Sequence, residues 1–394
     1  MGNYDSLRQH LDEYWNTASE DQSGWRYRLS NLVTNFGNIP LPNPFVPPNH
    51  EYFAKSQYYW DSYFTILGMV KQNREQALIA KGMVENLAYL YKRMGVVPMY
   101  NNIQSFGRTQ PPYLTRLAWE VYEAKVVDRL WLLEIMDIAD KEYLRVWNKH
   151  KRYLKDYGLS RYYPKLFKSK LAVYESGWDL STRFANNQAE LIPIDLNCQL
   201  YVYERDFAKL HRKLGDSSLA NRFDALADQR RERINNLMWD EDEGFYFDYD
   251  TKLKQLTPLA TLAGFFPLWA GVASAEQAER MIASLKKFEF KHGLSSSEEV
   301  PWRGRQWDYP NAWPPLQYIV ITGLKDYGYE TIAKRLAKKW LDLNQTLLER
   351  DGTLWEKHDV VAGEPGKSGL YPTQKNFAWT AGVATRLLAD FDLK

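Results

Sequence analysis

The sequence of 394 residues predicts an all-α fold in which helix pairs alternate with long loops, as in an α/α toroid. Three observations favour this class. Helical stripes of apolar residues recur along the chain, period-2 alternation is confined to short pieces such as Gly244–Asp250, and loops rich in polar and aromatic residues separate the stripes. In a toroid such loops converge at one end of the ring, so distant parts of the chain can build one site there.

Helical patterns account for most of the chain. The clearest is a stripe of Ile332, Leu336 and Trp340, which recur every four residues with lysine and arginine on the opposite face. Similar stripes predict helices over residues 74–93, 115–155, 195–213, 217–238, 272–287 and 376–391. The functional loops are expected at residues 36–60, 95–112, 156–178, 239–258, 289–315 and 351–375.

We expect the chain to form one domain over residues 1–394, because no Ser/Gly-rich linker divides it. Residues 1–50 form a lead-in that begins with helical sequence and ends in the proline-rich Ile39–Asn49. Proline does not fit the interior of a helix. The proline-rich segment is therefore expected to run extended across the mouth of the site.

The composition is that of an ordinary globular protein, with 45% hydrophobic and 25% charged residues. The net charge is +2 and there is no basic arm, which argues against nucleic-acid binding. No apolar run reaches the ~18 residues of a membrane span. Residues 1–25 lack the apolar stretch of a signal peptide. These features predict a cytoplasmic protein with no membrane partner, and they leave its oligomeric state open.

Cysteine and histidine usage gives no sign of a disulfide framework or a metal. Cys198 is the only cysteine, and the six histidines are scattered without ligand spacing. The acidic segment Trp239–Asp250 lacks the spacing and the closing glutamate of an EF-hand loop. It is predicted to be a helix end followed by an exposed hairpin. We expect no metal and no cofactor.

Three Trp-Asp boxes in separate thirds of the chain carry the functional signal. They are YYWDSYF at Tyr58–Phe64, SGWDLSTRF at Ser176–Phe184 and QWDYPNAWPP at Gln306–Pro315. An aromatic ring covers the C–H face of a pyranose, while a neighbouring acid binds hydroxyls or handles the glycosidic proton. One such pair also occurs in ordinary packed turns, but three of them predict a carbohydrate site.

Hydrolysis of a glycoside needs two carboxyl groups. In an inverting enzyme these groups lie ~6.5–9.5 Å apart, because the attacking water must fit between the base and the sugar. Asp179 follows Gly177 and Trp178; it is a candidate general acid, although a helix N-cap would also explain it. Glu356 is a candidate general base or, alternatively, half of a surface ion pair. Asp61 and Asp308, in aromatic-rich boxes, are better suited to holding sugar hydroxyls.

Arg108 and Gln110, in FGRTQPPYL, supply guanidinium and amide donors just before two prolines. Such donors suit vicinal hydroxyls or a carboxylate. An arginine that only fastens its own loop is the alternative, and the local sequence does not decide between the two.

Taken together, these blocks resemble the trehalase family of inverting α-glucosidases, whose fold is an (α/α)6 toroid. The matching blocks occur in family order between residues 58 and 383: YYWDSYFTILGM, GRTQPPYL, ESGWDLSTRF with IPIDLNCQLY, QWDYPNAWPPLQ, LWEKHDVV and YPTQKNFAWTAGV. The SGWDLSTR and QWDYPN blocks are the most specific.

The resemblance implies roles for individual residues. Asp179 falls on the family's general acid and Glu356 on its general base. The positions that line the family's sugar pocket are here Trp60, Asp61, Arg108, Gln110, Gln306 and Trp307, and the C-terminal motif adds Gln374, Phe377 and Trp379. The boxes themselves add Tyr59, Trp178 and Asp308 to the expected sugar contacts.

The chain departs from the family pattern in polar groups with which family members grip the two glucose units. NHEYFAKSQ, around Phe53, lacks the usual arginine, Val97–Tyr100 replaces I-P-N-G, and Leu370 stands where a glutamate is expected. The resemblance thus implies an inverting α-glycosidase acting on a small α-glucoside such as trehalose. A glycosyl-glycerate hydrolase and a non-catalytic sugar-binding toroid are the alternatives.

Overall fold

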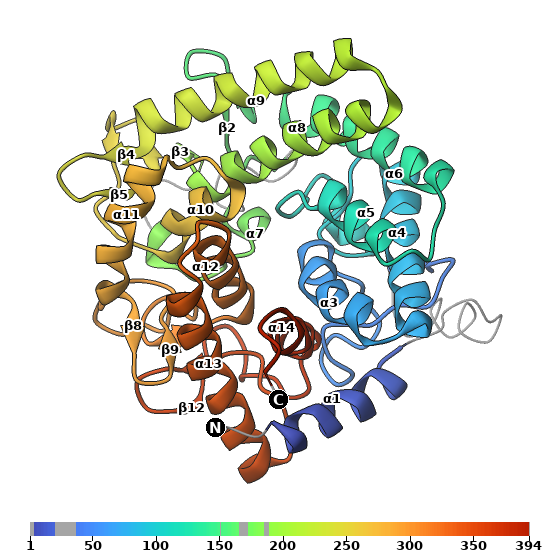
Figure 1. The fold of residues 1–394 in the computed structure, drawn as a ribbon, viewed down its shortest axis with the longest axis vertical. Helices are drawn as coiled ribbons and strands as arrows, with labels where there is room; N and C mark the ends of the chain where they lie inside the picture. The colour runs from blue at the N-terminus through green and yellow to red at the C-terminus, as the bar shows by residue number, and fades with distance from the viewer. Residues whose placement is uncertain (1–3, 20–36, 150, 165–171, 185–188, 394) are drawn as a thin grey trace.

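The helices form a closed double ring (Figure 1). The computed structural model describes residues 4–19, 37–149, 151–164, 172–184 and 189–393. Part of the predicted lead-in, residues 20–36, lies outside these ranges. The inner ring consists of α3 (Tyr59–Gln72), α5 (Leu114–Glu123), α8 (Ile194–Leu214), α10 (Phe266–Ala270), α12 (Pro314–Asp326) and α14 (Ala378–Asp390). Each packs against the next, and α14 returns to α3.

A second layer of helices surrounds this ring. It comprises α4 (Arg74–Met94), α6 (Arg129–Glu142), α9 (Ser217–Met238), α11 (Ala275–Ser284), α13 (Glu330–Asp351) and α1 (Asp5–Thr17). Most of these helices pack on the inner helix that precedes them in the chain. The N-terminal α1 instead packs on α13 and α14, with the indole N–H of Trp15 donating to Thr385 at 3.1 Å. The predicted α/α toroid is confirmed.

The inner helices are apolar on nearly every side. Every residue of α3 from Tyr59 to Met69 is buried, as is every residue of α12 from Pro314 to Leu324. A helix surrounded by other helices needs no polar face, so its sequence shows no stripe. For this reason the predicted helices omitted α3 and α12, and they also omitted α10, which has only five residues. The predicted stripes match α4, α8, α9, α13 and α14, although α14 is buried from Ala378 to Thr385.

Two predicted helical ranges were too long. The range 115–155 contains two helices, α5 and α6, with a short connection between them. The second helix begins after Asp128, whose side chain caps it by accepting a hydrogen bond from the backbone N–H of Trp131. After α6 a single π-helical turn, Tyr143–Trp147, ends the helical segment. The range 272–287 contains α11, which starts only at the capping box formed by Ser274 and Gln277.

Ring closure between α3 and α14 depends on two glycines. A β-carbon on Gly68 would lie 2.7 Å from Cα of Gly382, and one on Gly382 would lie 2.1 Å from the carbonyl oxygen of Phe64. Both distances are too short for any side chain. The two backbones therefore cross at a separation that only glycine permits.

Short two-residue strands occupy the loops between helices. They form the pairs β1 (Tyr153–Leu154) with β2 (Leu159–Ser160), β4 (Trp239–Asp240) with β5 (Phe245–Tyr246) and β8 (Glu289–Phe290) with β9 (Gly293–Leu294). Two three-stranded sheets have the orders β3 (Leu191–Ile192), β6 (Tyr249–Asp250), β7 (Gln255–Leu256), and β10 (Asn311–Ala312), β11 (His358–Asp359), β12 (Glu364–Pro365). All neighbouring strands are antiparallel.

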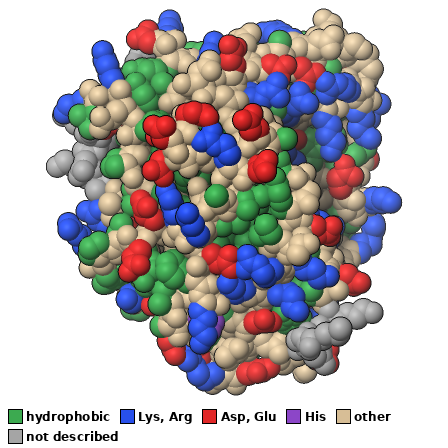
Figure 2. All heavy atoms as spheres, turned by 60° about the vertical axis from the view of Figure 1, so that its left-hand side comes forward, with side chains coloured by type: hydrophobic (Ala, Val, Ile, Leu, Met, Phe, Trp, Pro, Cys, Tyr) green, Lys and Arg blue, Asp and Glu red, His purple; other side chains and the backbone are tan. Residues whose placement is uncertain are grey.

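The acidic segment 239–250 follows a helix end and forms a hairpin as predicted, but the hairpin is exposed only at its turn, because Phe245 and Tyr246 are buried. It follows α9 directly, and β4 and β5 form a hairpin. The carboxylate of Asp240 accepts the backbone N–H groups of Asp242 and Glu243, both at 2.9 Å, so it closes the turn. Elsewhere on the surface acidic and basic side chains are interspersed, as Figure 2 shows for one face. That mixture agrees with the small net charge.

Candidate active site

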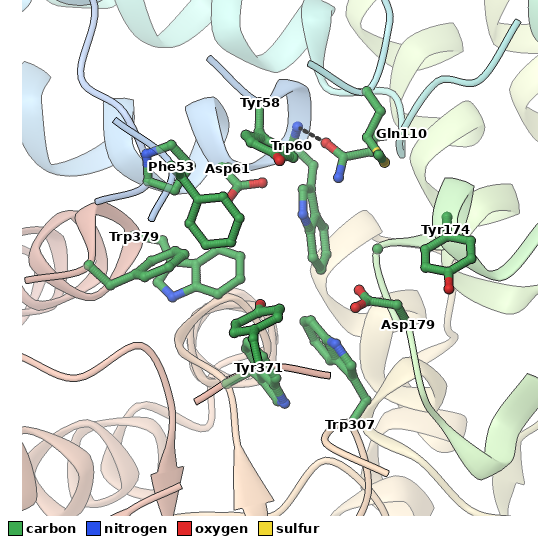
Figure 3. A pocket seen from close by; sticks show the side chains of 15 residues that line it. Phe53, Tyr58, Trp60, Asp61, Gln110, Tyr174, Asp179, Trp307, Tyr371 and Trp379 are labelled. Atoms are coloured by element: carbon green, nitrogen blue, oxygen red, sulfur yellow. Dashed lines mark hydrogen bonds between the residues drawn. The ribbon is translucent and has the colours of Figure 1, made fainter. Parts of the chain in front are cut away.

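A cavity of about 150 Å³ lies where the loops before the inner helices meet (Figure 3). Its walls come from the segments that lead into α3, α5, α12 and α14, and from the Ser176–Phe184 box. The lining residues are Pro48, Phe53, Tyr58, Trp60, Asp61, Met99, Gln110, Tyr174, Gly177, Asp179, Trp307, Trp313, Tyr371, Phe377 and Trp379. Segments separated by more than three hundred positions in the sequence thus share one site.

Tryptophan rings make up much of the cavity wall. Trp307 and Trp313 are stacked, with ring centroids 3.9 Å apart and an interplanar angle of 2°. Trp60 lies 5.5 Å from Trp307, and Trp379 meets Trp313 edge-on at 5.5 Å. The packed rings hold one another rigidly and present apolar surface, which suits the C–H face of a sugar ring.

Asp179 reaches the cavity because Gly177 brings its loop against Trp60. Gly177 has φ +76°, and a β-carbon there would lie 2.6 Å from the Cζ2 of Trp60. The amide nitrogen of Gln306 donates to Oδ2 of Asp179 at 3.0 Å. Burial raises the pKa of Asp179 to about 6, and the negative charge of Glu356 adds to this shift. The carboxyl group therefore holds a proton over a wider pH range than an exposed aspartate does.

Glu356 is fully buried next to the cavity and is held at every polar atom. Its Oε1 accepts the hydroxyl of Tyr371 at 2.7 Å, and its Oε2 accepts the ammonium of Lys357 at 2.8 Å. The indole N–H of Trp379 donates to its backbone oxygen at 2.9 Å. The ammonium of Lys357 is fully buried as well, so the ion pair lies out of contact with solvent. Lys357 also lies 4.8 Å from the centroid of the Trp313 ring.

Asp61 is a third acid at the cavity, and only 7% of its surface is exposed. Burial raises its pKa to about 8; its own backbone N–H opposes this shift, and the negative charges of Glu356 and Asp179 reinforce it. At neutral pH the group is mostly a neutral acid, so it can donate its O–H to a sugar hydroxyl as well as accept. Two acids thus face one small volume, and a third, Glu356, lies directly behind its wall.

Gln110 completes the polar lining. Its side-chain oxygen accepts the backbone N–H of Trp60 at 3.2 Å, which fixes the amide at the first turn of α3 (Figure 3). Because the side-chain oxygen accepts this backbone hydrogen bond, the amide N–H₂ group of Gln110 is the part available to donate to a ligand.

Three residues expected to contact sugar support the fold of the site instead. Tyr59 is buried, and its hydroxyl donates to Glu142 at 2.9 Å; the neighbouring Tyr58 lines the cavity in its place. Trp178 packs behind Trp307, with ring centroids 5.3 Å apart. Gln306 is buried and reaches the cavity only through its bond to Asp179.

Asp308, Arg108 and Gln374 fasten loops. Asp308 accepts the hydroxyl of Ser181 at 3.0 Å and the backbone N–H of Thr182 at 2.9 Å, so it anchors the loop of the candidate acid. Arg108 donates to the backbone oxygen of Gln104 at 2.9 Å, which is the loop-fastening alternative considered for it. The amide oxygen of Gln374 accepts from Asn49 at 3.0 Å.

Several lining residues were missed from the sequence, notably Tyr58, Phe53, Tyr174 and Tyr371. Tyr58 belongs to the first box, but the box alone does not show which of its two tyrosines precedes the helix. Tyr371 is the first residue of the C-terminal block YPTQKNFAWTAGV, and its place in that block was the available signal that it lines the cavity. Nothing in the local sequence around Phe53 or Tyr174 distinguishes them from core aromatics.

Two further features concern ligands and membranes. Within the ranges that the structure describes, no cluster of three or more His, Cys, Asp or Glu side chains is placed to hold a metal ion. None of the helices in those ranges combines the length and the apolar character needed to cross a bilayer.

Comparison with known proteins identifies the family. The trehalase family model matches residues 4–169 and 164–392. The periplasmic trehalase of Citrobacter koseri is 30% identical over 97% of this chain and 73% of its own length, and that of Escherichia coli is 29% identical over similar shares, 97% and 74%.

Solved structures agree. Neutral trehalase Nth1 from Saccharomyces cerevisiae superposes with a TM-score of 0.78 at 30% identity, over 88% of this chain and 73% of that one. A mannosylglycerate hydrolase from Thermus thermophilus superposes with a TM-score of 0.71 over 96% of this chain and 99% of that one. Its identity of 20% supports the shared fold alone.

The expected cytoplasmic location is contradicted by the relatives from Escherichia coli and Citrobacter koseri, which are named periplasmic trehalases. The expectation rested on the absence of an apolar leader in residues 1–25. Signal peptides are removed from mature chains, so that absence is not evidence for the cytoplasm.

The family match therefore covers nearly the whole chain, and each of the three boxes contributes lining residues to the cavity, among them Asp61, Asp179 and Trp307. The protein is a glycosidase, and it belongs to the trehalase family of glycoside hydrolases.

Proposed function

We propose that the protein is an inverting α-glycosidase in which Asp179 is the general acid and Glu356 the general base. The observation that carries this proposal is the contrast between the two carboxyl groups. Asp179 has a pKa raised to about 6, and its side chain accepts from a neutral amide. Glu356 is paired with the buried ammonium of Lys357. One group is thus prepared to give a proton and the other to take one.

The reaction follows from this contrast. A sugar ring stacks on the tryptophan wall, and the amide of Gln110 and the neutral carboxyl of Asp61 hold its hydroxyls. Asp179 protonates the departing oxygen while Glu356 removes a proton from a water that attacks the opposite face of the anomeric carbon. Carboxylates alone stabilise the oxocarbenium-like transition state, so the mechanism requires no cofactor.

The whole chain acts as one catalytic unit in this proposal. Lining residues come from both ends of the sequence, from Pro48 to Trp379. A cut between Asp179 and Trp307 would therefore separate lining residues of the same cavity.

One experiment tests the proposal directly. The protein is incubated with a panel of α-linked disaccharides and glycosyl-glycerates, and released sugar is followed by NMR from the first seconds. Inversion at an α-glycoside gives the β-anomer first. Initial release of the α-anomer would contradict the placement of a water beside Glu356. Glu356→Gln serves as the matched control, because it should bind sugar without releasing it; if no α-linked compound is hydrolysed, the non-catalytic alternative is favoured.

A smaller aglycone than the second glucose of trehalose is the second candidate. It is favoured by Leu370, which is 50% exposed beside the cavity residue Tyr371, and by Phe53, which lines the cavity in the segment that lacks the family arginine. Polar groups contribute specificity only where their partners are present. We therefore expect trehalose to have a lower kcat/KM than a small α-glucoside or a glycosyl-glycerate. The highest kcat/KM for trehalose in the same panel would restore the plain trehalase assignment.

A further inference from the structure

A second cavity, of about 440 Å³, lies outside the active cavity and shares no lining residue with it. It is bounded by the end of α4, the loop at Phe106 and Gly107, the π-helical turn after α6, and Tyr163 beyond β2. Its volume is in the range of small-molecule sites, about 300–1,000 Å³.

The charges around this cavity are all of one sign. Arg145, Lys149, Lys151 and Arg152 line it, and the described lining residues include no aspartate or glutamate. Like charges gathered around one hollow repel one another unless a counter-charge enters. Glu175, which pairs with Arg152, and Glu142 are fully buried and do not line the hollow, so Arg145, Lys149 and Lys151 are the lining cations for which an anionic ligand would be the counter-charge.

Aromatic rings supply the rest of the recognition surface. Tyr163 has the ammonium of Lys151 at 5.4 Å and the guanidinium of Arg161 at 5.0 Å from its ring centroid. Phe106 lines the same hollow and is itself exposed. Rings beside cations fit a ligand that has both an apolar face and a negative group.

We propose that this cavity binds a small anionic sugar, that is, a hexose bearing a phosphate or a carboxylate. The ring of the sugar packs between Phe106 and Tyr163, and its anionic group is held by Arg145, Lys149 and Arg152. The site is separate from the active cavity, so it does not depend on the proposed catalytic mechanism.

Arg152 connects this site to the active cavity. Its Nη2 lies 2.5 Å from Oε1 of Glu175, and both side chains are buried. Glu175 also accepts the backbone N–H of Thr109 at 3.2 Å and that of Tyr163 at 2.9 Å. Thr109 precedes Gln110, and Glu175 stands four residues before Asp179. One carboxylate thus ties together the two loops that carry the lining amide and the candidate acid.

Because the guanidinium can bridge Glu175 and a bound anion at the same time, the ligand would hold Arg152, and through it both loops, more firmly. We expect binding in the second cavity to slow amide exchange in residues 105–112 and 172–184.

The binding test uses calorimetric titration with glucose 6-phosphate, glucuronate and inorganic phosphate. Arg145→Ala/Lys149→Ala removes two exposed cations from the hollow, and Lys286→Ala/Lys334→Ala removes the same charge from other exposed positions. The first pair should weaken binding of an anionic sugar by about tenfold or more, and the second pair should not change it. The tighter of the two sugars identifies the anionic group.

Three outcomes would overturn the proposal: no saturable binding of either sugar, equal affinity in the wild type and the Arg145/Lys149 variant, or an equal loss in the control pair. Phosphate binding as tightly as both sugars would overturn the role of the rings. If an anionic sugar bound more tightly to the Asp179→Asn variant, which has less negative charge in the active cavity, the anion would be placed in that cavity instead. Exchange that is unchanged or faster in residues 105–112 and 172–184 on saturation would overturn the link through Arg152.

Discussion

The hydroxyl of Tyr371 donates a 2.7 Å hydrogen bond to Oε1 of Glu356 while the residue lines the active cavity. The other carboxylate oxygen is held by Lys357, so the candidate base is oriented on both sides before a sugar enters. Tyr371 itself is stacked on Tyr52 with centroids 5.5 Å apart, and Phe53 meets it edge-on at 5.7 Å.

Replacing Tyr371 with phenylalanine should lower kcat about tenfold and change KM little. The ring remains in place, but the carboxylate loses one of the donors that orient it, and a hydrogen bond to a charged group is worth about 1.5–3 kcal/mol. Steady-state kinetics on the best α-glucoside checks this. Tyr52→Phe is the matched control, because it alters the stacked ring without touching Glu356; an unchanged kcat in Tyr371→Phe would show that the bond does not position the base.

Asp179→Asn should abolish hydrolysis of glycosides with poor leaving groups, because no proton reaches the departing oxygen. General acid catalysis contributes typically 10²–10⁴-fold. On α-glucosyl fluoride, whose leaving group needs little protonation, much of the rate should return. Glu356→Gln should be inactive on both substrates. Equal losses on the two substrates in Asp179→Asn would remove it from the role of acid.

The pH dependence follows from the pKa of Asp179, which burial raises to about 6. A general acid works only while protonated, so kcat/KM should fall as the pH rises through about 6, tenfold per unit above it. The same profile measured on α-glucosyl fluoride should lack this alkaline fall. A fall of equal size on both substrates would assign the titration to another group.

Asp61 makes folding stability pH-dependent in the opposite sense to an acid whose pKa is lowered by a salt bridge. Its pKa is about 8 in the folded protein and ~3.9 in an unfolded chain. Between these values the folded state binds the extra proton, so stability falls as the pH rises. Asp61→Asn should therefore raise Tm relative to the wild type more at pH 8.5 than at pH 5. The exposed Asp242→Asn is the control; a gain independent of pH would contradict the assignment.

Gly382→Ala should destabilise the protein strongly, because its β-carbon would lie 2.1 Å from a backbone oxygen of α3. Overpacking in a core costs typically 1–3 kcal/mol, and here the obstacle is a backbone that cannot rotate away. Urea unfolding measures the loss. Ala389→Ser, at an exposed position of the same helix, should change stability by less than about 0.5 kcal/mol. A tolerated Gly382→Ala would mean that the two helices separate easily.

The sequence predicted the helices that show a polar stripe, and it missed two long helices, α3 and α12, whose sides are buried almost throughout. The stripe of Ile332, Leu336 and Trp340 describes α13 because lysines and arginines lie opposite it. α3 and α12 are enclosed by neighbours, so apolar residues fill all their sides and no period survives. An apolar run of this length does not distinguish a buried helix from a buried strand.

The cavity was predicted in part. Trp60, Asp61, Gln110, Asp179, Trp307 and Trp379 line it, and Glu356 lies directly behind. A motif shows which residues are close, but not which side chains point inward. That depends on where α3 begins, which decides between Tyr58 and Tyr59. It also depends on hydrogen-bond partners far away in the sequence, such as Thr182, whose backbone N–H donates to the carboxylate of Asp308.

The crossing of α3 and α14 has a consequence for biosynthesis. Trp60 is synthesised more than three hundred residues before Phe377 and Trp379, which close the other side of the cavity. Contacts of such wide sequence separation form late in folding. A nascent chain therefore has no complete cavity until α14 has been made, and loss of the residues from Phe377 onward would leave both candidate carboxylates without this wall of the site.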